Sequence, residues 1–127
     1  MKNVKQANIN ITLKDLFLKW LDITSAFHNL TNQQKQVLAL FLYYHYNYKQ
    51  EITNDKILWK LVFDYDTKLL IEKELGIKNA GLQNVLTSFR KRNIINDKNE
   101  ITPTFIPNIE PGAQDFKVIF NFNIIHD

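Results

Sequence analysis

One local pattern recurs along this chain: a residue that can cap a helix stands directly before apolar residues at helical spacing. Thr12 precedes Asp15, and Thr31 precedes Gln34, at the spacing of a capping box. The apolar residues that follow recur three and four positions apart, as on the buried face of a helix. Two antiparallel helices joined by a turn at residues 25–29 are therefore predicted, the second reaching about residue 48. The apolar face of the first is Leu13, Leu16, Phe17, Trp20 and Leu21.

Two more helices are predicted on either side of Gly76. Asp66 can cap a helix over residues 67–75, and Gly76 stands where a left-handed residue would end it. Asn79 can cap a last helix that reaches about Arg92. Two short helices joined by a tight turn form a helix-turn-helix. The apolar face of the last helix is Leu82, Val85, Leu86 and Phe89. Just before this pair, residues 55–63 are predicted as a short helix, with a strand as the alternative.

Extended structure is predicted after the last helix. Residues 94–106 combine β-forming isoleucines with a turn composition at 96–99, which predicts a hairpin. Pro103 and Pro107 lack a backbone N–H, so this hairpin is expected at a sheet edge. Residues 115–125 alternate apolar and polar side chains and are predicted as a strand, which either completes that sheet or pairs with another subunit. A similar alternation in residues 8–13 predicts a short strand or extended arm.

Composition narrows the function classes. The chain has 127 residues, of which 45% are hydrophobic, and this length and composition suit one domain with a packed core. It has no cysteine for disulfides or thiolate sites, and His28, His45 and His126 lack metal-motif spacing. It has no glycine-rich phosphate loop, no apolar stretch long enough for a bilayer and no signal-peptide pattern. We expect a soluble, non-secreted, non-enzymatic protein that needs no metal or cofactor and binds no membrane.

Positive charge is concentrated in one segment. The net charge is +2 over residues 1–77, +4 over 78–92 and −3 over 93–127. Such a concentration suits contact with DNA phosphates, although cations also gather at helix C-termini through the helix dipole. On the face opposite the apolar stripe, Asn and Gln side chains can pair bidentately with adenine. The predicted nucleic-acid-binding residues are Lys78, Asn79, Gln83, Asn84, Thr87, Arg90, Lys91, Arg92 and Lys98.

An aromatic run on the second predicted helix allows two interpretations. Tyr43, Tyr44, Tyr46 and Tyr48 stand close together around His45. Such residues stack bases in some proteins that bind single-stranded nucleic acids. More often they pack one side against a core and turn their hydroxyl groups to the surface, which is the interpretation favoured here.

Three segments together resemble winged helix-turn-helix proteins: TNQQKQVL at residues 31–38, KLLIEKELGIKNAGLQNVL at 68–86 and FRKRNII at 89–95. The resemblance covers residues 30–107. It implies a mainly α fold with a small antiparallel β-sheet (α+β), a recognition helix over 79–92 and a DNA-contacting wing over 94–106. The expected divisions are an N-terminal arm (1–12), a winged-helix domain (13–107) and a C-terminal arm (108–127).

The sequence departs from the winged-helix pattern at two places. The turn of the expected wing carries Lys98 beside Asp97, with Glu100 close by, and is less basic than a wing that grips DNA. The acidic, strand-forming segment after Pro107 has no counterpart in the pattern.

Asparagine and isoleucine occur 15 times each, and the 16 basic residues include only two arginines. This composition resembles genes of bacteriophages and plasmids from AT-rich bacteria, crAss-like phages among them. The leading hypothesis is a phage or mobile-element protein that binds double-stranded DNA as a regulator, replication or packaging factor, in the host cytoplasm or the virion. The alternative is a virion structural or connector protein whose arms bind other phage proteins or itself. Its predicted partner-binding residues are Phe116, Val118, Phe120 and Phe122.

Overall fold

The computed structural model describes residues 4–127 and shows a helical protein. The first three residues of the predicted N-terminal arm lie outside this range. The described helices are α1 (Leu13–Ile23), η1 (Ser25–Phe27), α2 (Asn32–Lys49), α3 (Asp55–Val62), α4 (Tyr65–Leu75), α5 (Asn79–Lys91) and η2 (Pro103–Phe105), where η1 and η2 are single 3₁₀ turns.

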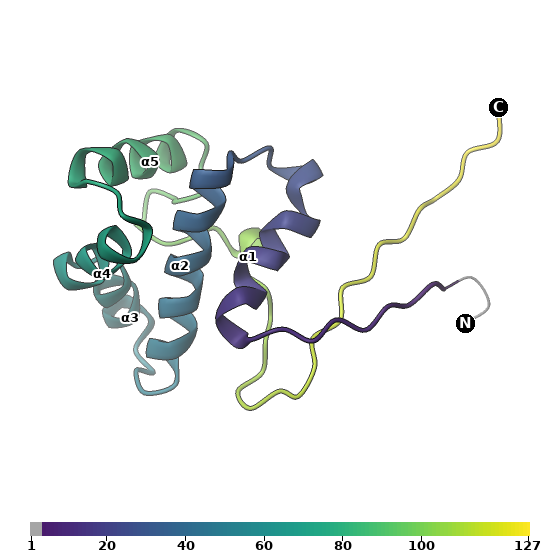
Figure 1. The fold of residues 1–127 in the computed structure, drawn as a ribbon, viewed down its shortest axis with the longest axis horizontal. Helices are drawn as coiled ribbons and strands as arrows, with labels where there is room; N and C mark the ends of the chain where they lie inside the picture. The colour runs from purple at the N-terminus through teal and green to yellow at the C-terminus, as the bar shows by residue number, and fades with distance from the viewer. Residues whose placement is uncertain (1–3) are drawn as a thin grey trace.

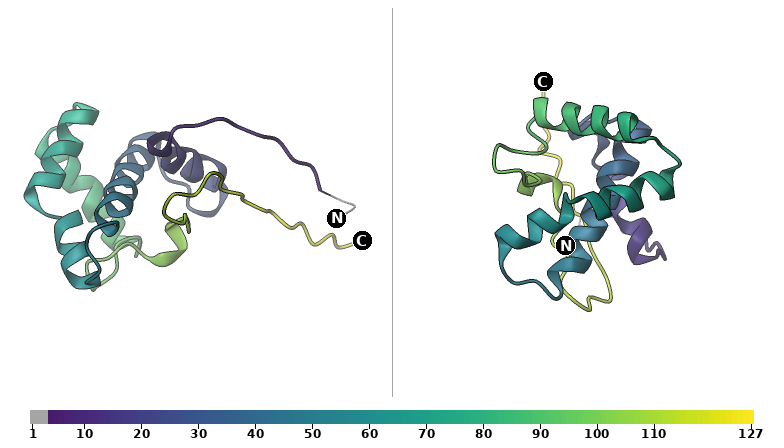
Figure 2. Two further views of the ribbon diagram at one scale, coloured as in Figure 1. Left: turned by 90° about the horizontal axis from the view of Figure 1, so that it is seen from below. Right: turned by 90° about the vertical axis from the view of Figure 1, so that its left-hand side faces the viewer.

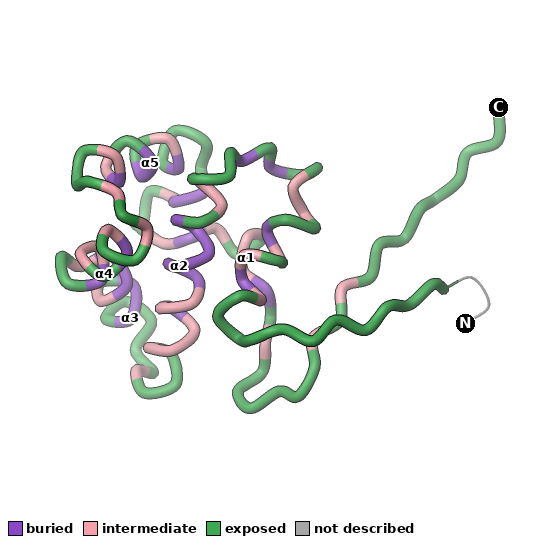
Figure 3. Tube along the Cα trace, in the orientation of Figure 1, coloured by how far each residue is buried: buried purple, intermediate pink, exposed green. Residues whose placement is uncertain are grey.

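The long helix α2 lies at the centre of the fold (Figure 1). It contacts α1 on one side, and α3, α4 and α5 lie on the other (Figures 1 and 2). Residues 37–42 of α2 are all buried, so this helix is covered on several sides rather than along one stripe. Figure 3 shows the buried residues gathered along α2 and the helix faces turned toward it. The core is therefore built around α2.

Local capping chemistry confirms several predicted helix boundaries. The Thr12 hydroxyl accepts a hydrogen bond from the Asp15 N–H at 3.2 Å. Thr31 and Gln34 form the complete capping box, with donor–acceptor distances of 3.2 and 3.0 Å. Gly76 ends α4 in the left-handed region, with φ of +64°. Each side-chain cap contributes about 0.5–2 kcal/mol to helix stability, which explains why these boundaries follow the sequence closely.

Other boundaries correct the prediction. Asp64 caps α4, with its carboxylate accepting from the Thr67 N–H at 2.9 Å, whereas Asp66 lies in the first turn. Lys78, rather than Asn79, occupies the N-cap position of α5 and makes no side-chain capping bond. The alternatives for residues 55–63 resolve as helix α3, ending at Val62. On α1, the predicted face holds except at Leu13, which is 40% exposed.

The predicted α+β fold is wrong, because the described residues contain no sheet. Their β-pairing is limited to one isolated antiparallel bridge between Ile95 and Ile101. The Asn96 side chain accepts hydrogen bonds from the backbone N–H groups of Lys98 and Glu100, at 3.0 and 3.2 Å. These two bonds stabilise a tight turn at residues 96–100. Residues 103–105 then turn as η2, since proline suits a first helical position and ends a ladder. The expected wing is therefore a short loop.

The C-terminal arm is extended and forms no strand pairing within the described residues, so the first of the two predicted alternatives, that residues 115–125 complete a sheet in this chain, is wrong. No backbone–backbone hydrogen bond joins residues 115–127 to the rest of the described chain. The helical body has no strand edge, so this arm finds no strand to pair with among the described residues. Both arms leave the body on the side of α1 (Figures 1 and 2) and are exposed along most of their length (Figure 3).

His45 is an ionisable side chain within the core. It is 7% exposed, and its ring stacks on Trp59 with centroids 4.2 Å apart and planes 17° from parallel. Burial, with a smaller contribution from the positive charge of Lys49, lowers the pKa of His45 to about 4. The neutral ring is thus the form that packs in the folded protein.

This shifted pKa predicts a pH dependence of stability. Below about pH 6.5 the unfolded chain binds a proton at His45, whereas the folded chain does so only near pH 4. The free energy of unfolding should therefore fall as pH is lowered through this window, by about 3 kcal/mol in total. Urea denaturation of wild type and His45→Phe between pH 7 and 4 measures this loss. Parallel pH profiles for the two proteins would contradict the assignment, because the carboxylates are common to both.

Candidate nucleic-acid interface

The orientation of α5 is fixed by its apolar stripe, as predicted. Leu82, Leu86 and Phe89 are fully buried and Val85 is 6% exposed. The helix packs against α2 and α4 and lies along the upper edge of the helical body in Figure 1. The side of α5 that faces away from the core is therefore determined by packing rather than by any partner.

We call this side the outward face of α5. Its residues recur at helical spacing and are all exposed: Ala80, Asn84, Thr87 and Lys91. Gln83 lies at the edge of the face and is half-buried, and Asn79 is exposed at the start of the helix. The Thr87 hydroxyl donates to the Gln83 backbone carbonyl at 2.9 Å. The outward face thus presents amides, methyl groups and a cation, with no acid.

Basic side chains lie at both ends of α5. Lys78 stands at the N-cap, and Arg90 and Lys91 in the last turn. All three are exposed, and none forms an ion pair within residues 4–127. Lys78 and Lys91 are about 20 Å apart along the helix axis, at 1.5 Å per residue. The two ends of the helix are therefore available to anionic groups on either side of its polar centre.

Arg92 has a second, structural role that the sequence did not reveal. Its guanidinium donates to the backbone carbonyl of His28, in the connection between α1 and α2. His28 is buried, its Nδ1 accepting from the Leu30 N–H at 3.0 Å, so that Nε2–H donates to the Leu21 carbonyl at 2.8 Å. Arg92 thereby ties the end of α5 to a hydrogen-bonded turn, although it was predicted only as a phosphate contact.

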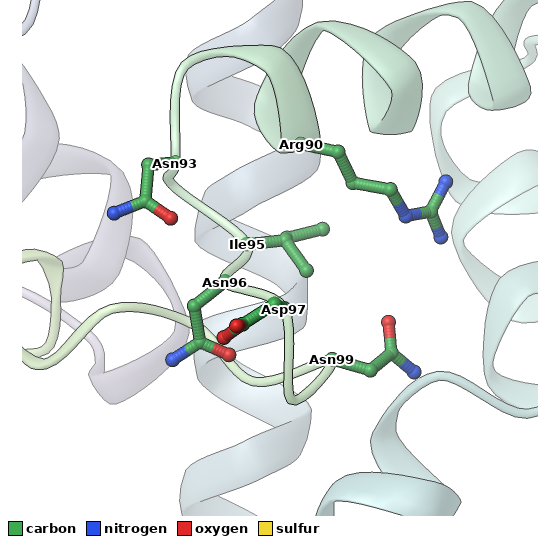
Figure 4. A pocket seen from close by; sticks show the side chains of 6 residues that line it. All are labelled: Arg90, Asn93, Ile95, Asn96, Asp97 and Asn99. Atoms are coloured by element: carbon green, nitrogen blue, oxygen red, sulfur yellow. The ribbon is translucent and has the colours of Figure 1, made fainter.

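The loop after α5 places Lys98 in solvent, but its surroundings are not strongly basic. A shallow hollow between α5 and the loop is shown in Figure 4, where Arg90 and Asn99 extend toward the same side. Asp97 also lines this hollow, so one acidic and one basic side chain contribute to its lining. Lys98 is therefore an isolated cation rather than part of a basic wing.

The tyrosines of α2 are packed rather than displayed. Tyr43 and Tyr46 lie edge-on or tilted against Phe17, with ring centroids 6.1 and 5.9 Å apart. The Tyr48 hydroxyl lies 3.1 Å from that of Thr67. All four tyrosines are half-buried, which favours the core interpretation of this run over a base-stacking platform.

The four predicted partner-binding residues of the C-terminal arm fall into two groups. Phe116 and Val118 are half-buried, and the Phe116 ring lies 6.1 Å from Trp20. Phe120 is 44% exposed and stacks on the exposed Phe27 ring at 6.1 Å. Phe122 is 84% exposed. The arm thus touches the body as far as Phe120, and Phe122 beyond it is exposed.

No protein family model, curated protein or solved structure matches this chain. Within residues 4–127, no helix is long and apolar enough to cross a bilayer, and no three His, Asp or Glu side chains are grouped to hold a metal. Among the surfaces described, the outward face of α5 combines exposure, hydrogen-bonding side chains and unpaired positive charge.

Proposed function

We propose that this chain is a non-enzymatic DNA-binding protein that places the outward face of α5 in the major groove of duplex DNA. The support is the order of side chains along the helix. Cations stand at its two ends, and residues 79–89 between them carry no charge. The major groove is about 12 Å wide and is flanked by phosphates. A helix about 20 Å long therefore reaches phosphates with its ends while its middle contacts base edges.

Lys78 is the observation that carries this proposal. A helix N-terminus is partially positive, so acidic residues are favoured there. The helices α1, α3 and α4 each have an acid in the first turn, whereas α5 has none and begins with Lys78. Helix α2 also lacks an acid, but the Thr31 capping box satisfies its start. The dipole explains Arg90 and Lys91, but a cation at the N-cap opposes it and suits an anionic partner.

The composition supports a more specific assignment within this proposal. Its resemblance to AT-rich phage and plasmid genes favours a regulator, replication or packaging factor of such an element. The protein would then act in the host cytoplasm or the virion.

Replacing Lys78 separates stability from binding. Lys78→Asp introduces a capping carboxylate and should raise the free energy of unfolding by about 0.5–2 kcal/mol. The same change should weaken binding to a mixed-sequence duplex. It should also make the salt dependence shallower, reducing the magnitude of the slope of log affinity against log salt concentration by about 1 or more. Denaturant unfolding and fluorescence anisotropy from about 50 mM salt upward measure the two effects.

Lys56→Asp is the matched control, because Lys56 is an exposed residue in the first turn of α3 and the change in net charge is the same. It should leave binding much closer to wild type. Equal losses in the two variants would contradict a specific role for α5, and absence of wild-type binding at about 50 mM salt would refute DNA binding itself.

A second candidate function is protein assembly through the C-terminal arm, as a virion structural or connector protein. It is favoured by four apolar side chains of the arm that are each between 75% and 91% exposed: Ile119, Phe122, Ile124 and Ile125. These apolar side chains and their unpaired backbone are suited to adding a strand to another subunit. The partner proposed here is a second copy of the chain.

Deleting residues 119–127 tests this candidate. Since these residues make few contacts with the body, the free energy of unfolding should change by only about 0.5 kcal/mol. Self-association, measured by light scattering over a concentration series, should be present in the full chain and lost in the truncated one. A full chain that stays monomeric throughout would rule out self-assembly through the arm.

A further inference from the structure

We propose that α5 selects A·T base pairs, with Asn84 and Thr87 as the residues that discriminate them from G·C. This inference rests on the proposed function and names the base composition that the same surface selects. In the major groove, guanine is typically recognised by Arg or Lys and cytosine by Asp or Glu, whereas Asn and Gln pair with adenine. Residues 79–89 contain none of the four charged types. The middle of the helix therefore lacks the usual partners of G·C pairs.

Asn84 is placed to pair with adenine. It lies at the centre of the outward face, is exposed, and its amide makes no hydrogen bond to another described residue. Both the amide oxygen and the amide nitrogen are thus available for the N6 and N7 positions of adenine. Gln83 has the same chemistry but is half-buried at the edge of the face, so Asn84 is the primary reading residue.

Thr87 is placed to contact the methyl group of thymine. Its hydroxyl already donates to the backbone carbonyl of Gln83 at 2.9 Å, so the methyl group is the part of the side chain left for a ligand. Ala80 presents a second methyl group on the same face. Apolar contacts of this kind recognise the C5-methyl group of thymine. Amide and methyl groups thus alternate along the outward face.

The spacing of these residues sets the length of the selected site. Ala80 and Thr87 are about 10 Å apart along the axis, at 1.5 Å per residue. This distance corresponds to about three base-pair steps of 3.4 Å. The inferred core site is therefore about three or four consecutive A·T pairs, with Lys78 and Lys91 contacting phosphates at its two sides.

The test uses the full chain and two duplexes with identical flanks and either an A·T or a G·C core. Fluorescence anisotropy at about 150 mM salt should show at least roughly tenfold tighter binding to the A·T core. Asn84→Ala should remove most of this preference. Lys91→Ala should weaken binding to both duplexes by a similar factor, because a phosphate contact carries no base information. Thermal melting verifies that these exposed-site variants remain folded.

Base analogues assign the contacts to single atoms. Replacing adenine by 7-deazaadenine removes the N7 acceptor, and should weaken wild type but not Asn84→Ala. Replacing thymine by uracil removes the C5-methyl group, and should weaken wild type but not Thr87→Ser, which keeps the hydroxyl. Analogues that leave wild-type binding unchanged would overturn the inference, because the preference would then arise from the minor groove or from DNA shape.

The outcomes also separate this inference from the proposed function. Equal affinity for the two cores would overturn A·T selection while leaving DNA binding in place. A preference that survives in Asn84→Ala would overturn the role of Asn84. Absence of binding to either duplex at about 50 mM salt would overturn the proposed function, and the inference with it.

Discussion

Burial of the apolar stripe of α5 is the constraint on which the proposed DNA-binding surface depends. Leu82, Leu86 and Phe89 are fully buried against a core centred on α2. Burying a large apolar side chain contributes about 1.5–3 kcal/mol to stability. Turning α5 about its axis would expose these side chains, and new surface contacts would not compensate for the lost burial. The outward face and the two basic ends are therefore presented whether or not a ligand is bound. The link from Arg92 to the His28 carbonyl further fixes the C-terminal end of the helix.

The parts of this fold that follow from sequence are those governed by neighbours along the chain. The Thr31 capping box, the left-handed Gly76 and the buried stripe of α5 each depend on residues within two turns, and all three are present as predicted. Competing local options explain the errors. Asp64 and Asp66 can both cap a helix, and the structure uses the first; α5 begins without a side-chain cap, so the pattern pointed to Asn79 instead of Lys78.

The parts of the structure that the sequence analysis missed have two causes: local turns that outweigh a strand pattern, and contacts between distant residues. The isoleucines at 94 and 95 favour a strand, but the Asn96 turn and the 3₁₀ turn at Pro103 limit pairing to one bridge. The apolar and polar residues of the C-terminal arm alternate as in a strand. This pattern indicates β-propensity, but it does not provide the edge of another strand with which the arm could pair. The bond between Arg92 and His28 spans 64 residues and has no counterpart in local spacing. For the candidate site, residue types and their shared face were predictable, whereas the structural role of Arg92 was not.

Amide chemical shifts, measured by NMR during titration with a duplex carrying an A·T core, test the central claim most directly. If α5 enters the major groove, the largest changes should cluster in residues 78–91. The described parts of the two arms, residues 4–12 and 108–127, and the amides of α1 should change little, and serve as an internal reference. Changes concentrated in the arms, or spread evenly over the body without a maximum at α5, would contradict the account.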